Sequence, residues 1–205
     1  MAYEYGTPSR PLEATLAVLR EGLMHAYRAE HLPAHRRSPR RARRLRRIRG
    51  WHREVGRLLV QTDRVVHETL PRVERDTGYT FGAPDGLIRV LMDRSTARLF
   101  SGILAGFPEE ALPVPARDLA LLGSASSDAR VLALIGEVTL EVKGLPAGAD
   151  LASLCDRWDL SRIAFSCRGD LTAREKETLA LAVLGLIYVG GGTDALRGAV
   201  PACGG

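Results

Sequence analysis

The 205-residue sequence predicts an all-α protein, and three observations support this fold class. Apolar residues recur at three- and four-residue steps through most long segments, which is the period of a helix buried on one face. Alternation of apolar and polar residues, the pattern of a half-buried strand, is scarce. Residues that start and stop helices stand at the ends of the periodic segments.

The first 69 residues predict two helices. Ser9 is a candidate N-cap for the first helix. Its apolar stripe consists of Leu12, Leu16, Leu19, Leu23 and Tyr27. Pro33 and Pro39 bracket a turn, and a second helix of about seven turns follows. Its apolar positions are Leu45, Ile48, Trp51 or His52, Val55, Leu59, Thr62 and Val66. An antiparallel pair is the simplest arrangement of these two helices.

The rest of the chain continues the helical pattern. A helix from residue 70 is closed by Gly78, with Tyr79 and Phe81 as anchoring aromatics, and another starts at Pro84 and Asp85. Further helices are expected over about 117–143 and from 148.

The last predicted helix starts with a capping box, Thr172 with Glu175. An apolar run then extends to Val189. The glycines at 190–192 are expected to end the helix. They are not followed by the lysine of a phosphate loop, so a phosphate-binding role is not expected for them.

Positive charge is concentrated in residues 36–57, which hold eleven arginines and one acid, Glu54, whereas the remainder of the chain is acidic. This asymmetry divides the chain into a basic helical extension, 1–69, and a globular domain, 70–205. Arginine makes forked, charge-assisted hydrogen bonds to phosphate, so the segment predicts nucleic-acid binding. The candidate residues are Arg36, Arg37, Arg40, Arg41, Arg43, Arg44, Arg46, Arg47, Arg49, Arg53 and Arg57. A solvated helix face and an anionic lipid surface are the alternatives.

Composition limits the class of protein. No apolar run approaches the roughly 20 residues that span a bilayer, and the N-terminus does not resemble a secretory signal, so a cytoplasmic protein without a membrane partner is expected. Three scattered cysteines predict neither a disulfide framework nor a zinc site. His31 and His35 are four apart, but Pro33 lies between them, so surface histidines are expected instead of a metal pair. Of the 29 basic residues 27 are arginine, and asparagine is absent, which fits a GC-rich genome or a thermophilic source.

Four segments in order resemble the ribonuclease III catalytic domain over about residues 68–200. VERDTGYTFGAPDGLIRVLMDRST is similar to the family's opening, in which a helix ends in threonine-histidine-arginine-serine; Asp93 stands at the histidine position. ARDLALLGSAS resembles the signature helix, and ADLASLCDRWDLSRI resembles the helix after it. LALAVLGLIYVGGGTDALRGAV is similar to the closing segment. The resemblance implies a ribonuclease III-like helical domain behind a basic helical hairpin.

Active members of this family cut double-stranded RNA with Mg²⁺ held by carboxylates from two helices, since Mg²⁺ takes oxygen ligands. The positions that match the family's four carboxylates are Ala120, Ser124, Thr178 and Leu181. None is acidic, so the catalytic site is expected to be degenerate. A shifted register, with VLALIGEV (131–138) as the signature, places Glu137 at the aspartate position. Glu175 and Glu177, near the expected carboxylate positions of the last helix, are two further candidates.

The sequence therefore predicts a non-catalytic protein that binds structured or double-stranded RNA and needs no cofactor or metal. The resemblance implies a homodimer, and association with the ribosome or another ribonucleoprotein is a further expectation. A Mg²⁺-dependent, double-strand-specific endoribonuclease is the first alternative. A dimeric scaffold whose extension binds protein is the second.

Overall fold

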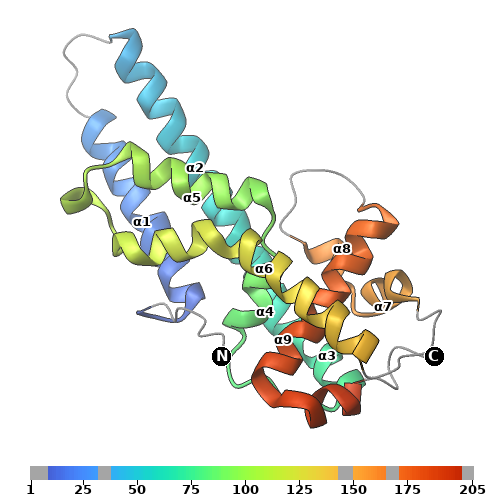
Figure 1. Cartoon of the computed structure of the whole chain (residues 1–205). Helices are drawn as coiled ribbons and strands as arrows, with labels where there is room; N and C mark the ends of the chain where they lie inside the picture. The colour runs from blue at the N-terminus through green and yellow to red at the C-terminus, as the bar shows by residue number, and fades with distance from the viewer. Residues whose placement is uncertain (1–8, 32–37, 143–149, 165–170, 200–205) are drawn as a thin grey trace.

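The structure is a computed structural model that describes residues 9–31, 38–142, 150–164 and 171–199. These residues form helices and no β-strand, which confirms the all-α prediction. The helices are α1 (Leu12–His31), α2 (Pro39–Arg64), the π-helical turn η1 (Val65–Thr69), α3 (Leu70–Thr77), α4 (Asp85–Val90), α5 (Arg94–Gly106), the 3₁₀ turn η2 (Glu109–Ala111), α6 (Ala116–Val142), α7 (Leu151–Arg157), α8 (Leu160–Ile163) and α9 (Ala173–Ala199). Figure 1 shows α1 and α2 at one end of the molecule, α7 to α9 at the other, and α6 extending between them.

Helices α1 and α2 form the expected antiparallel pair. The predicted leucine stripe of α1 is buried, together with Ile48, Val55 and Leu58 of α2. Glu30, near the end of α1, contacts Arg44 near the start of α2, with 2.6 Å between Oε1 and Nε. Near the other end of the pair, the Arg20 side chain lies over Gly56. These two contacts fix the antiparallel direction.

Helix α2 does not stop at the end of the basic region. It continues through η1 into α3, so the chain is helical without interruption from Pro39 to Thr77. Within η1 the Leu70 N–H donates to the Val65 carbonyl, the five-residue step of a π-helix. The proposed division between residues 69 and 70 thus falls inside a continuous helix. Gly78 then ends α3 as predicted, in the left-handed conformation (φ 68°).

Helices α6 and α9 cross at two glycines and form the centre of the fold. A Cβ at Gly185 would lie 2.0 Å from the Leu132 carbonyl oxygen, and a Cβ at Gly136 would lie 2.2 Å from that of Leu181. Because no side chain separates the helices there, their backbones touch. The pairing of 132 with 185 and of 136 with 181 shows that α6 and α9 are antiparallel.

Asp93 starts a separate helix, α5, which the sequence pattern does not predict. The resemblance placed the DRST segment at the end of a helix, whereas α4 ends at Val90. Asp93 Oδ1 accepts hydrogen bonds from the backbone N–H groups of Ser95 (2.8 Å) and Thr96 (2.9 Å), so it caps the N-terminus of α5.

The predicted cap of α1 is wrong. Ser9 donates its N–H to Asp118 of α6 (3.1 Å) and its hydroxyl to the same carboxylate. The first N–H of α1, from Leu12, is instead accepted by Asp85 of α4 at 3.3 Å. Burial raises the pKa of Asp85, while this hydrogen bond and the charge of Arg89 lower it. The two carboxylates therefore attach the start of α1 to α4 and α6.

The glycines at 190–192 interrupt α9 as predicted. The backbone leaves helical geometry at Gly192, with φ 68° and ψ −161°, and a second helical stretch follows to Ala199. Gly190 and Gly191 lie against the ring of Tyr79, where a Cβ would come within 2.2 Å and 2.6 Å of its atoms. Gly190 and Gly191 therefore make room for an aromatic anchor directly before the break at Gly192.

Two helices pass a test of length and hydropathy for membrane spans, Ala116–Glu141 and Ala173–Ala199. In their most apolar windows 33% and 44% of the residues are buried inside the protein. They are α6 and α9, the two central helices of the bundle. Core helices of water-soluble proteins pass the same test.

Candidate nucleic-acid interface

The arginine segment forms the first half of α2. Ser38 caps this helix by accepting the Arg41 N–H at 3.2 Å, and Pro39 occupies the first turn, where its missing N–H costs nothing. The buried residues of α2 lie on one side. Because successive residues advance by about 100°, the arginines at 46, 49, 53 and 57 fall on the opposite side, and Arg43 falls on its flank.

Some of these arginines hold α2 in place. Arg41 donates to the Glu30 carbonyl, and Arg44 pairs with the Glu30 carboxylate. Arg57 pairs with Glu54 on its own helix at 3.1 Å. Arg46 donates from Nε to the Ala42 carbonyl at 3.4 Å. These contacts use guanidinium groups within the protein, so these arginines are less available to a ligand.

Two arginines lie over aromatic rings. The guanidinium carbon of Arg47 is 5.9 Å from the centroid of Trp51, and that of Arg44 is 5.7 Å from the centroid of Phe107. The Trp51 ring lies against Gly106 of α5, where a Cβ would come within 2.4 Å of it. This packing fixes the arginine-bearing part of α2 on α5.

Four arginines remain exposed and make no ion pair or hydrogen bond with any described residue; they are Arg40, Arg43, Arg49 and Arg53. Glu54 is the one acid among residues 38–57 and is already paired. The outer face of α2 therefore presents positive charge without matching negative charge. Arg36 and Arg37 lie outside the described residues.

The four positions that match the ribonuclease III carboxylates are not brought together. Leu181 lies at the crossing of α6 with α9, and Thr178 lies one turn further from Ser124. Ser124 precedes the crossing by twelve residues on α6, about 18 Å along the helix. Its hydroxyl donates to the Leu121 carbonyl (2.9 Å), and Ala120 is exposed one turn earlier.

The three alternative glutamates do not form a metal site. Within the described parts of the chain, no group of three or more acidic, histidine or cysteine side chains could hold a metal ion. Glu137 and Glu177 are exposed. Glu175 closes the predicted capping box, accepting from the Thr172 N–H at 2.9 Å while its own N–H donates to Thr172 Oγ1 at 3.3 Å.

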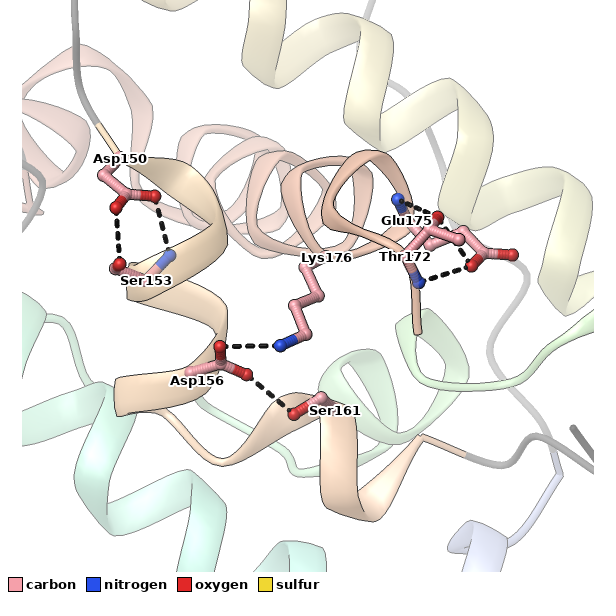
Figure 2. A network of polar contacts seen from close by, with 7 residues as sticks. All are labelled: Asp150, Ser153, Asp156, Ser161, Thr172, Glu175 and Lys176. Atoms are coloured by element: carbon pink, nitrogen blue, oxygen red, sulfur yellow. Dashed lines mark hydrogen bonds and ion pairs between the residues drawn. The ribbon is translucent and has the colours of Figure 1, made fainter. Parts of the chain in front are cut away.

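Figure 2 shows that this capping box belongs to a polar cluster over α7, α8 and α9. Lys176 pairs with Asp156 at 2.7 Å, and Asp156 accepts a hydrogen bond from Ser161 at 3.0 Å. These bonds lower the pKa of Asp156. Each carboxylate in the cluster thus has a partner that links or caps helices, and the cluster stabilises this end of the molecule. Nearby Cys155 is buried, and burial raises its thiol pKa to about 12.

Part of the basic surface is not apparent from the sequence, because the pattern of α1 is dominated by its leucine stripe and the histidines are separated along the chain. An open cavity of about 620 Å³ lies between α1 and α2, and its lining includes Arg20, His25, Arg28 and His52. The spacing of Arg20 and Arg28, two turns apart on the polar side of α1, was the available signal. His31 stacks on Tyr27, with 5.6 Å between ring centroids, and His35 lies outside the described residues.

Comparisons with protein families, with curated proteins and with solved structures found no match to this chain.

Proposed function

We propose that this protein binds RNA through the outer face of α2 and does not cut it. The observation that carries the proposal is the set of exposed, unmatched arginines on a helix that is fixed to its neighbours. Phosphate contacts dominate the affinity of such surfaces. Because α2 is already anchored through Trp51 and Glu30, binding would not have to pay for folding the helix.

Charge repulsion supports a polyanionic partner. Arg49 and Arg53 are one turn apart on α2, and no described acid pairs with either. Like charges at this spacing destabilise a free helix by a few tenths of a kcal/mol per pair. A phosphate backbone along the helix would remove this repulsion.

The finer proposal is a degenerate ribonuclease III-like protein that binds double-stranded or structured RNA. It rests on the sequence resemblance and on the absence of carboxylates at Ala120, Ser124, Thr178 and Leu181. Duplex RNA is recognised through its backbone and 2′-hydroxyl groups, which suits a row of arginines better than base reading does. Homodimer formation and a place in a ribonucleoprotein belong to the same proposal.

The test compares two triple variants that lose the same charge. Arg43→Gln, Arg49→Gln and Arg53→Gln remove the unmatched arginines of α2, and Arg75→Gln, Arg94→Gln and Arg98→Gln remove exposed arginines elsewhere. Binding of a short labelled RNA duplex is measured by fluorescence anisotropy over a range of salt. The α2 variant should bind at least about tenfold more weakly, with a salt slope smaller by about 2 to 3. Equal losses in both variants would contradict a specific α2 interface.

The same duplex, incubated with Mg²⁺ and analysed on a denaturing gel, tests the absence of cleavage. Intact RNA at protein concentrations that saturate binding is the expected result. Cleavage that EDTA abolishes would replace the proposal with a Mg²⁺-dependent endoribonuclease, and Glu137, Glu175 and Glu177 would then be the first ligands to substitute.

A further inference from the structure

The cavity between α1 and α2 has the composition of an anion-binding groove. Its cationic or titratable lining comes from both helices, with Arg20, His25 and Arg28 on α1 and His52 on α2. The apolar part of the lining includes Met24 and Pro113, and Glu21 is the one acid of the lining. A volume of about 620 Å³ falls in the range of sites that hold small molecules or parts of larger ones.

Two arginines of α1, Arg20 and Arg28, line this groove. Neither makes an ion pair with a described residue, and both are exposed. Burial lowers the pKa of His52, and the positive charge of Arg20 lowers it further. The free protein thus disfavours the protonated imidazole, and a bound anion would reverse this preference.

The groove is continuous with the arginine face of α2. Arg53 follows His52 directly and Arg49 precedes it by three residues, so both lie within about a third of a turn of it around the helix. On the α1 side of the groove, Arg20 and Arg28 are two turns apart, about 12 Å along the helix. A strand that runs along the outer face of α2 therefore passes beside the groove.

We propose that this groove binds a phosphate group, supplied by the backbone of the RNA that the α2 face holds. This inference rests on the proposed function and deepens it, because it extends the interface from one helix to the cleft between two. Arg20 and Arg28 provide the forked donors, and His52 provides a further donor when it is protonated.

The proposal implies a defined pH dependence. A phosphate beside His52 raises the imidazole pKa above its value in the free protein, so the complex takes up a proton. Affinity therefore rises as the pH falls from the pKa in the complex to the lowered pKa of free His52. The charged or titratable groups around His52 are Arg20, Glu21, His25 and Arg28 of α1 and Arg49 and Arg53 of α2. The remaining segment that lines the groove contributes Pro113, which does not titrate.

The first experiment compares Arg20→Gln/Arg28→Gln with a control pair, Arg75→Gln/Arg98→Gln, which removes the same charge. Arg75 is 23 residues beyond His52 on the same helical run, about 35 Å away. The groove variant should lower the salt slope for duplex RNA by about one, the loss of a single phosphate contact, and the control should not. If both variants keep the wild-type slope, the groove does not hold a backbone phosphate and the proposal is overturned.

The second experiment needs no charge variant. The His52 imidazole is titrated by NMR in the wild-type protein, assigned with His52→Gln, in the absence and presence of duplex RNA. RNA should raise its pKa, and His52→Gln should remove the gain in affinity between about pH 8 and about pH 6. If RNA binds but His52 titrates as in the free protein, this inference fails while the proposed function stands.

A third arm uses inorganic phosphate alone. If phosphate raises the pKa of His52 but no RNA binds, the groove holds a free phosphate and the proposed function fails. If neither probe moves the His52 titration, the groove proposal is wrong whatever the RNA affinity.

Discussion

Two antiparallel helix pairs organise this molecule, and they are held together differently. Helices α1 and α2 meet through leucine side chains and through Glu30 contacts to two arginines, and they leave a cleft beside His52. Helices α6 and α9 meet through their backbones at Gly136 and Gly185. The side chains between α1 and α2 can therefore adjust to a ligand, whereas the backbone contact between α6 and α9 leaves no room for change.

The largest effect is expected at the α6–α9 crossing. Gly185→Ala places a methyl group 2.0 Å from the Leu132 carbonyl oxygen, so the two backbones must separate. We expect the free energy of unfolding in urea to fall by about 3 kcal/mol, the upper part of the range for overpacked cores.

Gly50→Ala on α2 is the matched control, because a Cβ there meets nothing within 4 Å. Alanine is a better helix former, so this variant should be more stable by roughly 0.5–1 kcal/mol. Similar losses in both variants would mean that the helices do not touch at Gly185.

A smaller effect is expected where α2 attaches to α5. Trp51→Ala removes the half-buried ring that covers Gly106, and we expect a loss of about 2 kcal/mol, less than for a fully buried aromatic. Trp158 remains as a fluorescent reporter of unfolding, since the chain has two tryptophans. Trp51→Phe should retain most of the stability. If Trp51→Ala unfolds at the wild-type urea concentration, Trp51 does not anchor α2.

The smallest effect is expected at the start of α9. Thr172→Ala removes the hydroxyl that accepts the Glu175 N–H, which should lower the free energy of unfolding by about 1 kcal/mol. Thr178→Ala is the control, because its hydroxyl donates to the Arg174 carbonyl inside the helix and caps nothing. That variant should be neutral or slightly more stable. The capping box would be unimportant if the two threonine variants had equal stability.

Local signals in the sequence were sufficient where a feature depends on neighbouring residues. The capping box of Thr172 and Glu175, the helix end at Gly78 and the leucine stripe of α1 were all predicted correctly. Features that depend on distant residues were not. Ser9 has the residue type and position of a cap, but its actual partner, Asp118, is 109 residues away.

The same division applies to the candidate interface. The arginines of α2 are visible in the sequence. Which of them contact other residues of the protein, and which stay without a partner, depends on the positions of Glu30, Trp51 and Phe107. The groove is not visible in the sequence because most of its lining is on α1, more than twenty residues before His52. Two helices create it only when they lie side by side.

The π-helical turn between α2 and α3 has a consequence for the phase of the long helix. From Val65 onward the buried residues follow at every fourth position, Val65, Thr69, Val73 and Thr77. In a regular α-helix such a stripe drifts by about 40° per step, and the wider turn of η1 takes up part of that drift. The one additional residue in the π-helical turn thus keeps both halves of a 39-residue helix facing the protein. The arginine-rich half and the half that packs on the core therefore form one continuous helix.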